Sequence, residues 1–232
     1  MNETITLSPE KRALAKDVVV DYMLASIDEL EQLHPALNLL AHPSTAVGSH
    51  DFFVRCYEAG VQHAQAGATE TVSALPDALS HERQRSWLLC AAAGRLDALC
   101  QPLTHNRLCD LAGQFCAGIA EADDETRSGF YTVRSISLPV YRRLLRDKHS
   151  AAVCLQQALL HLLAWKSDSP WARQQAQRLL WQGGVLGDKG EFALMTLDDS
   201  LRERQVEWPE LWSLLAVTGF LVRFPAGPIF AD

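Results

Sequence analysis

The side chains that could carry out chemistry in this chain are spread along it and form no compact motif. His50 and Asp51 are adjacent, His81 precedes an alanine-rich apolar run, and Asp168 separates two helical patterns. Histidines and carboxylates can transfer protons or bind a divalent cation. No nucleophile-elbow or metal-ligand spacing accompanies them. His50 and Asp51 also make a reasonable helix N-cap, so a structural role stays open beside a catalytic one.

Three further charged residues could take part in binding a charged ligand. They are Arg134, Arg204 and Glu125. Each also has an ordinary interpretation, since the arginines can pair with acidic segments. Glu125 lies in the acidic segment 121–127, which we expect to be an exposed loop. His161 lies within an apolar helical pattern, so we expect it at the edge of the core and not as a ligand.

Length and composition limit the classes of protein that the chain can be. Its 232 residues are 48% hydrophobic, which suits one domain spanning 1–232. The net charge of −7 and the lack of a basic stripe argue against nucleic-acid binding. The apolar run 214–222 is shorter than the roughly 20 residues of a membrane span, and the N-terminus has no apolar stretch typical of a signal peptide. We expect a cytoplasmic protein that does not bind membranes.

The six cysteines show no paired spacing. None forms a CxxC motif, and a chain of this size does not need disulfides to build a core. Cysteine is among the residues most often buried. We therefore expect six reduced and mostly buried thiols.

Apolar residues recur at helical spacing through most of the chain, and no strand and hairpin pattern appears. The pattern predicts an all-α protein, a single compact domain of about eight or nine helices. The segment 211–221 is apolar around nearly its whole circumference, which predicts a buried central helix beginning near Trp208 and Pro209.

Capping residues predict where several helices begin and end. Thr104, Ser150 and Ser169 are expected N-caps, and Ser80 is expected to open the helix that contains the alanine-rich run. Asp188 followed by Glu191 resembles a capping box at the start of another helix. Gly183 and Gly184 follow a helical pattern and are expected to form a C-cap, not a phosphate cradle.

Three blocks of the sequence resemble one known family of enzymes. The blocks are 88–96, 128–145 and 197–223. In the last two, the matching residues are Gly129, Phe130, Val133, Arg134, Leu138, Pro139, Tyr141, Arg142, Leu197, Asp198, Leu201, Arg204, Leu214, Leu215 and Ala216. This pattern is similar to that of the triphosphoribosyl-dephospho-CoA synthases, which serve citrate lyase and malonate decarboxylase. The resemblance implies transfer of a triphosphoribosyl group from ATP to 3′-dephospho-CoA, with release of adenine.

The chain departs from the family pattern where that pattern has its glycine-rich loop. The family's S-P-G-G-S-A-D falls on residues 207–213, which read EWPELWS here. The family's acidic motif ending in Thr-Asn keeps only Asp168, and no Lys-Gly pair follows His81. Glycine allows backbone amides to approach phosphate oxygens closely, whereas bulky side chains block that approach. We therefore expect weak or no triphosphoribosyl transfer.

The resemblance also implies roles for individual residues. Catalysis would fall to Asp168 and His81, and metal binding to Asp168 and Glu125. Nucleotide binding would fall to His50, Asp51, Arg134 and Arg204. An active protein would be a nucleotide-dependent triphosphoribosyl transferase that uses Mg²⁺ and ATP and binds dephospho-CoA; an inactive one would need no cofactor. The alternative is a non-catalytic helical binding or adaptor protein that contacts a protein partner.

Overall fold

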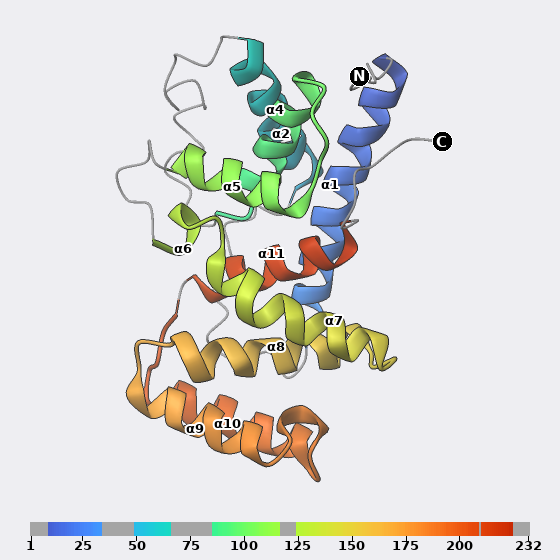
Figure 1. The fold of residues 1–232 in the computed structure, drawn as a ribbon. Helices are drawn as coiled ribbons and strands as arrows, with labels where there is room; N and C mark the ends of the chain where they lie inside the picture. The colour runs from blue at the N-terminus through green and yellow to red at the C-terminus, as the bar shows by residue number, and fades with distance from the viewer. Residues whose placement is uncertain (1–8, 34–48, 66–84, 117–123, 209, 225–232) are drawn as a thin grey trace. The chain divides into compact units, whose positions relative to one another are not determined.

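The computed structural model is helical throughout the part of the chain that it describes, which is residues 9–33, 49–65, 85–116, 124–208 and 210–224 (Figure 1). Those residues form ten α-helices, one π-helical segment and one short 3₁₀ helix, and none of them lies in a strand. The prediction of an all-α protein is therefore confirmed.

The chain divides into two compact units. The first unit comprises Met1–Ala25, Pro43–Tyr131 and Arg223–Asp232, and the second comprises Ser26–His42 and Thr132–Val222. The first helix, α1 (Pro9–Glu31), contributes to both units. That residues 1–232 fold as one domain stays a prediction.

The first unit is built around a pair of helices in close contact, α2 (His50–Gln65) and α4 (Leu88–Ala98). Helix α5 (His105–Cys116) packs on α4, and the four-residue helix α6 (Asp124–Arg127) packs on α5. Phe53, Cys56, Cys90 and Phe115 are almost completely buried and belong to the core of this unit.

The second unit is a succession of helices that pack mostly on their neighbours in sequence. In chain order they are η2 (Val133–Ser137, π-helical), α7 (Leu138–Arg146), α8 (Ala151–Lys166), α9 (Pro170–Trp181), η3 (Gly184–Leu186, 3₁₀), α10 (Gly190–Glu203) and α11 (Leu211–Arg223). Helix α8 contacts α7 on one side and α9 on the other, and α9 in turn contacts α10.

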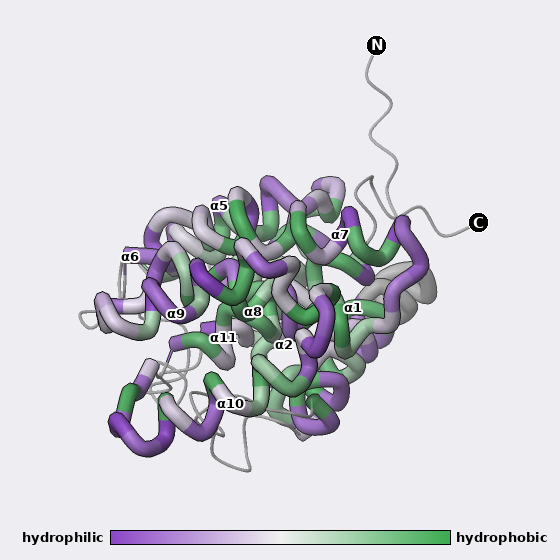
Figure 2. Tube along the Cα trace, turned by 90° about the horizontal axis from the view of Figure 1, so that it is seen from below, coloured by the Kyte–Doolittle hydropathy of each residue, from purple (hydrophilic) through white to green (hydrophobic). Residues whose placement is uncertain are grey.

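Helix α11 is the most buried element of the second unit. Every residue from Leu211 to Leu221 is buried, as the apolar sequence predicts. Hydroxyl groups near its middle are satisfied inside the core. Thr218 donates to the carbonyl of Leu214 at 2.7 Å and lies 2.6 Å from the Ser137 hydroxyl, and Ser26 donates to the carbonyl of Ala216 at 2.7 Å. Helices α5 and α10, by contrast, carry both hydrophobic and hydrophilic residues (Figure 2).

Several predicted helix boundaries are confirmed by capping contacts. The hydroxyls of Ser150 and Ser169 accept hydrogen bonds from the backbone amides of Val153 and Ala172, at 3.4 Å and 3.3 Å. Thr104 accepts one from the amide of Arg107 at 3.4 Å. Gly183 follows α9 with a left-handed φ of 99°, the geometry of a helix C-cap.

Two local predictions are wrong. Helix α10 begins at Gly190, its N-cap is Lys189 in a left-handed conformation, and no side chain caps it, so Asp188 forms no capping box. Residues 124–127 of the predicted acidic loop form α6. The alanine-rich helix α4 begins at Leu88 after a turn at Ser86 and Trp87; Ser80, its expected cap, lies outside the described residues.

All six cysteines lie in the described part of the chain, and none of them forms a disulfide there; five are buried and Cys100 is half-buried. No helix among the described residues is both long enough and apolar enough to cross a membrane.

Candidate functional site

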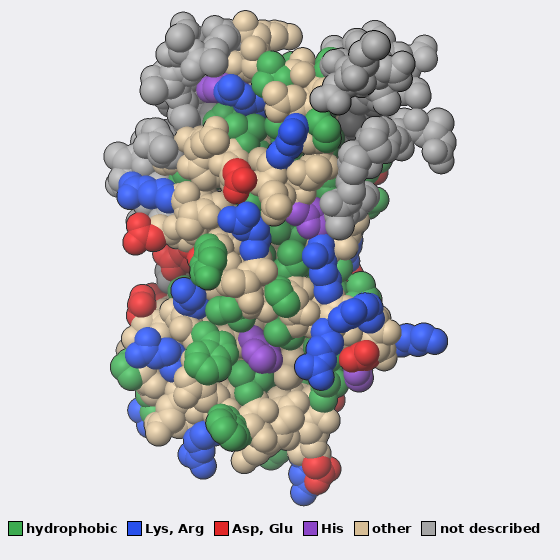
Figure 3. All heavy atoms as spheres, in the orientation of Figure 1, with side chains coloured by type: hydrophobic (Ala, Val, Ile, Leu, Met, Phe, Trp, Pro, Cys, Tyr) green, Lys and Arg blue, Asp and Glu red, His purple; other side chains and the backbone are tan. Residues whose placement is uncertain are grey.

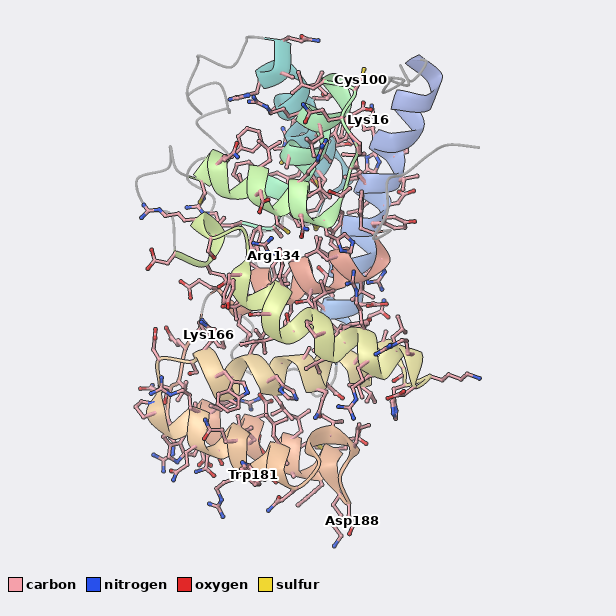
Figure 4. The ribbon with its side chains drawn as sticks, viewed as in Figure 1. Lys16, Cys100, Arg134, Lys166, Trp181 and Asp188 are labelled. Atoms are coloured by element: carbon pink, nitrogen blue, oxygen red, sulfur yellow. The ribbon has the colours of Figure 1, made fainter. Side chains whose placement is uncertain are left out.

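A polar cleft opens in the first unit beside the α2–α4 pair. Its volume is about 480 Å³. It is lined by Lys16 of α1, by Tyr57, Glu58, Val61, Gln62, Ala64 and Gln65 of α2, and by Asp97 and Ala98 of α4. Lys16 is the α1 residue labelled in Figure 4. We refer to this feature as the α2–α4 cleft.

Two glycines set the close spacing of the helices beside this cleft. A side chain at Gly60 would overlap the backbone carbonyl of Ala91, and one at Gly94 would overlap that of Tyr57. Each helix therefore places a glycine against the backbone of the other. This close approach is possible because glycine has no Cβ. It fixes the positions of Tyr57 and Glu58 relative to Asp97 in the last turn of α4.

A polar contact and an aromatic contact also hold α2 in place. The Arg95 guanidinium of α4 donates to Nδ1 of His63 on α2. An arginine has no acceptor, so this ring nitrogen must be the accepting one. The His63 ring also meets Phe115 of α5 edge to face, with centroids 5.1 Å apart. The α2–α4 cleft thus lies on a part of the unit whose helices are held at several points.

The charges lining the α2–α4 cleft are mixed. The Lys16 ammonium lies 3.9 Å from a carboxylate oxygen of Glu58, and both side chains are partly exposed. Asp97, by contrast, is only 5% exposed. Sequence reasoning did not select Lys16, Glu58 or Asp97 as candidates. The available signal was the single acidic residue of the apolar segment LLCAAAGRLDA, located in the last turn of its helix.

The cysteines near this region are poorly suited to nucleophilic chemistry. Burial raises the pKa of Cys56 on α2 to about 12, and it also raises the pKa of Cys90 on α4 well above its ordinary value. A nucleophilic cysteine needs a lowered pKa that favours its thiolate. These two thiols therefore act as packing residues between α2 and α4.

The second unit has a smaller groove between α9 and α10, of about 210 Å³. It is lined by Trp171, Gln175, Arg178 and Leu179 of α9, by Gln182 directly after that helix, and by Ala193, Thr196, Leu197 and Ser200 of α10. The guanidinium carbon of Arg204 lies 4.2 Å from the centre of the Trp171 ring, a cation–π arrangement. Arg204, one of the predicted nucleotide-binding residues, therefore lies beside this groove, where it stacks on the lining residue Trp171.

The remaining candidates of the second unit are not gathered at that groove. Arg134 is half-buried on the π-helical segment η2. Asp168 is exposed in the short connection between α8 and α9, directly before the N-cap Ser169. The amide of Ser169 donates to the hydroxyl of Ser167 at 3.2 Å, so this connection is a capped helix junction. Its geometry agrees with the predicted N-cap at Ser169.

The candidates of the first unit lie at helix starts. His50 and Asp51 open α2, are largely exposed, and approach each other to 3.6 Å between Nδ1 and Oδ1. The N-cap contact at this helix comes from Ser49, whose hydroxyl accepts from the amide of Phe52 at 3.2 Å. Glu125 is half-buried in α6. His81 lies outside the described residues.

No metal centre is apparent where the chain is described. Among those residues, no group of three or more His, Cys, Asp or Glu side chains could hold a metal ion. Asp168 and Glu125 belong to different units. Their roles as Mg²⁺ ligands stay predictions.

The residues that match the synthase pattern are mostly buried. Phe130, Val133, Leu138 and Tyr141 are at most 5% exposed, and so is the run Leu214–Ala216. Arg142, half-buried, donates to the carbonyl of Leu221 at 3.5 Å, and desolvation lowers its pKa. The resemblance therefore lies largely in residues that hold the second unit together.

The fold and its cavities define an all-helical protein with a cleft large enough for a small molecule, in which polar and charged side chains line the walls. The sequence is similar to that of bacterial enzymes of one kind. A protein of Klebsiella pneumoniae named 2-(5''-triphosphoribosyl)-3'-dephosphocoenzyme-A synthase is 38% identical, over 62% of this chain and 59% of its own length. The protein of that name in Escherichia fergusonii is 34% identical, over 62% of this chain and 60% of its own length.

A Salmonella gallinarum protein named as a probable synthase of the same kind is 37% identical, again over 62% of this chain and 60% of its own length. The chain thus spans about three fifths of the length of these curated relatives. No family model matches the chain. No solved structure matches it either.

Proposed function

We propose that the protein is similar in function to the triphosphoribosyl-dephospho-CoA synthases, that it keeps the binding of an adenine nucleotide, and that it transfers the triphosphoribosyl group weakly or not at all. The similarity to named synthases supports the first part. The side chains at positions 207–213 are the observation that carries the last part. The residues there differ from the glycine-rich loop of the family pattern in size, charge and backbone freedom.

The start of α11 leaves little room for a phosphate-binding loop at those positions. Leu211 and Trp212 are buried and belong to the core of the second unit. Glu210 is exposed immediately before the helix. A carboxylate about 4 Å from a phosphate charge is repelled by about 1 kcal/mol in water, and by more in a shielded cleft. Both size and charge therefore work against a triphosphate at this place.

The test is adenine release from ATP, measured with and without dephospho-CoA. The relative from Klebsiella pneumoniae serves as the positive control. Loss of one contact to a developing negative charge costs on the order of 10²–10³ in rate. We expect release by this chain to fall below the control by at least that factor. Robust adenine release that depends on dephospho-CoA contradicts the proposal, and Asp168→Ala is then the first variant to test.

A second candidate function is the non-catalytic helical binding or adaptor protein. The observation that favours it is a set of exposed apolar side chains between the end of α9 and the middle of α10. Trp181 is 90% exposed and Phe192 69%, and Leu186 and Met195 are also exposed. Figure 3 shows such hydrophobic side chains among lysines and arginines on the helices of the second unit, and Figure 4 labels Trp181 on α9.

Exposed apolar surface of this kind is typical of protein interaction sites. The simplest partner to test is a second copy of the chain. Sedimentation velocity at increasing concentration should then reveal self-association that Trp181→Ser abolishes, while Trp165→Ser, at another exposed tryptophan on α8, leaves it intact. A wild-type protein that sediments as a monomer throughout contradicts self-association.

A further inference from the structure

Asp97 is a buried carboxylate at the end of a helix that borders the α2–α4 cleft. The residue lies in the last turn of α4, where the helix dipole presents its negative end. It is also 5% exposed, and removing a carboxylate from water is costly. Residues that break local rules in this way are concentrated at functional sites.

The neighbours of Asp97 in the α2–α4 cleft suggest the chemistry of a ligand. Glu58 adds a second carboxylate, and Gln62 and Gln65 add amides that both donate and accept hydrogen bonds. Val61, Ala64 and Ala98 supply apolar wall. A ligand with several hydroxyl groups next to a flat apolar ring would satisfy both kinds of surface. The volume of about 480 Å³ lies within the range of roughly 300–1,000 Å³ typical of small-molecule pockets.

The charge of the lining residues indicates which end of a nucleotide would enter. Two carboxylates, Glu58 and Asp97, face one ammonium group, that of Lys16, so the lining carries a formal charge of −1. This net negative charge would repel a triphosphate. The vicinal hydroxyls of a ribose are donors, and carboxylates accept from such hydroxyls in dinucleotide-binding proteins. The neutral nucleoside end therefore fits this cleft better than the phosphates do.

We propose that the α2–α4 cleft binds the ribose of an adenine nucleotide whose 2′- and 3′-hydroxyls are both free, with Asp97 as their acceptor. A 3′-phosphate would place negative charge beside Asp97 and Glu58. The cleft would then distinguish dephospho-CoA, which has the free diol, from CoA, which does not. This assignment rests on the proposed function for the identity of the nucleotide, and it adds the location of the site and the basis of its selectivity.

Calorimetric titration of the full chain tests the selectivity directly. The probes are adenosine, 2′-deoxyadenosine and 3′-deoxyadenosine, followed by dephospho-CoA and CoA. A hydrogen bond to a charged group corresponds to a change of on the order of tenfold to a hundredfold in affinity. We expect a loss of that size when either hydroxyl is removed or the 3′-phosphate is added. Equal affinities within each set overturn the inference.

Variants test whether Asp97 is the acceptor. Asp97→Asn keeps the shape of the side chain and removes its charge, and we expect it to weaken adenosine binding at least about tenfold. Asp110→Asn changes an exposed carboxylate on α5 outside the cleft and should leave binding unchanged. Glu58→Gln, at a more exposed cleft position, tests the location of the site if Asp97→Asn does not fold, because removing this second carboxylate should reduce the discrimination against CoA. Adenosine binding that is unaffected in a folded Asp97→Asn protein overturns the assignment, and so does unchanged discrimination against CoA in the Glu58→Gln protein.

The outcome for this site can be separated from the outcome for the proposed function. Titration measures binding without turnover, whereas the proposed function is tested by adenine release. Diol-dependent binding combined with robust adenine release keeps the site and contradicts the weak-transfer proposal. Absence of nucleoside and dephospho-CoA binding overturns the site whatever the release assay gives.

Discussion

The α2–α4 pair of the first unit and helix α11 of the second unit represent opposite ways of packing a helix. In the first unit, Gly60 and Gly94 bring two backbones together with almost nothing between them. In the second unit, α11 buries large side chains of its own, among them Trp212 and Phe220. Backbone contact leaves room for a cleft beside the pair, whereas α11 is buried from Leu211 to Leu221.

The difference predicts which substitutions each region tolerates. A helix packed by large side chains should suffer when a side chain is made smaller, because a cavity remains. A helix pair packed through glycine should suffer when a side chain is made larger, because the backbones must separate. The predictions that follow test this contrast, from the largest expected effect to the smallest.

The largest effect is expected for Trp212→Ala on α11. Its side chain is 1% exposed, and removing a buried tryptophan costs about 3–5 kcal/mol of unfolding free energy. Chemical denaturation measures the loss. Trp181→Ala removes the same side chain from a site that is 90% exposed, and should change stability by less than about 0.5 kcal/mol. Equal effects of the two substitutions would show that α11 does not form the core of its unit.

The next effect is expected for Gly60→Ala on α2. The added methyl group would overlap the carbonyl of Ala91, and overpacking of this kind costs about 1–3 kcal/mol. Helix propensity alone predicts the opposite sign, a gain of about 0.5–1 kcal/mol. The sign of the change in denaturation midpoint therefore shows whether the steric overlap or the helix propensity dominates. Arg55→Ala, at an exposed position on the same helix, is the control and should be nearly neutral.

A smaller effect is expected where a helix end depends on one hydroxyl. Ser169→Ala removes the N-cap of α9 and should cost about 0.5–2 kcal/mol. Ser169→Asp keeps an acceptor at the same place and should restore most of the loss. Thermal unfolding of the two variants beside the wild type gives the comparison. If aspartate and alanine destabilise equally, the Ser169 hydroxyl does not cap this helix.

The smallest effect concerns pH. Burial lowers the pKa of His161 on α8 below its ordinary value of 6.5. The unfolded chain therefore binds a proton at a higher pH than the folded one, and this histidine lowers stability as the pH falls through about 6.5. His161→Gln should lose less stability between pH 7.5 and pH 5 than the wild type. If the difference in unfolding free energy between the two proteins stays constant from pH 7.5 to pH 5, the prediction is contradicted.

Local sequence features predicted much of the fold and little of the cleft. The hydroxyl caps at Ser150 and Ser169 and the left-handed Gly183 were predicted because each depends on residues within one helical turn. The capping box at Asp188 was wrong because the sharp turn before α10 places Lys189 at the helix start instead. No pattern pointed to the cleft, since its lining comes from α1, α2 and α4.

The sequence by itself determined that the chain is helical and that the segment 211–221 is buried, because hydrophobic periodicity and capping are local properties. Only the tertiary structure decided that Gly60 and Gly94 each meet the backbone of the opposite helix and that Lys16, Glu58 and Asp97 line one cleft. Such contacts join residues tens of positions apart, and they depend on how whole helices pack rather than on any short stretch of sequence.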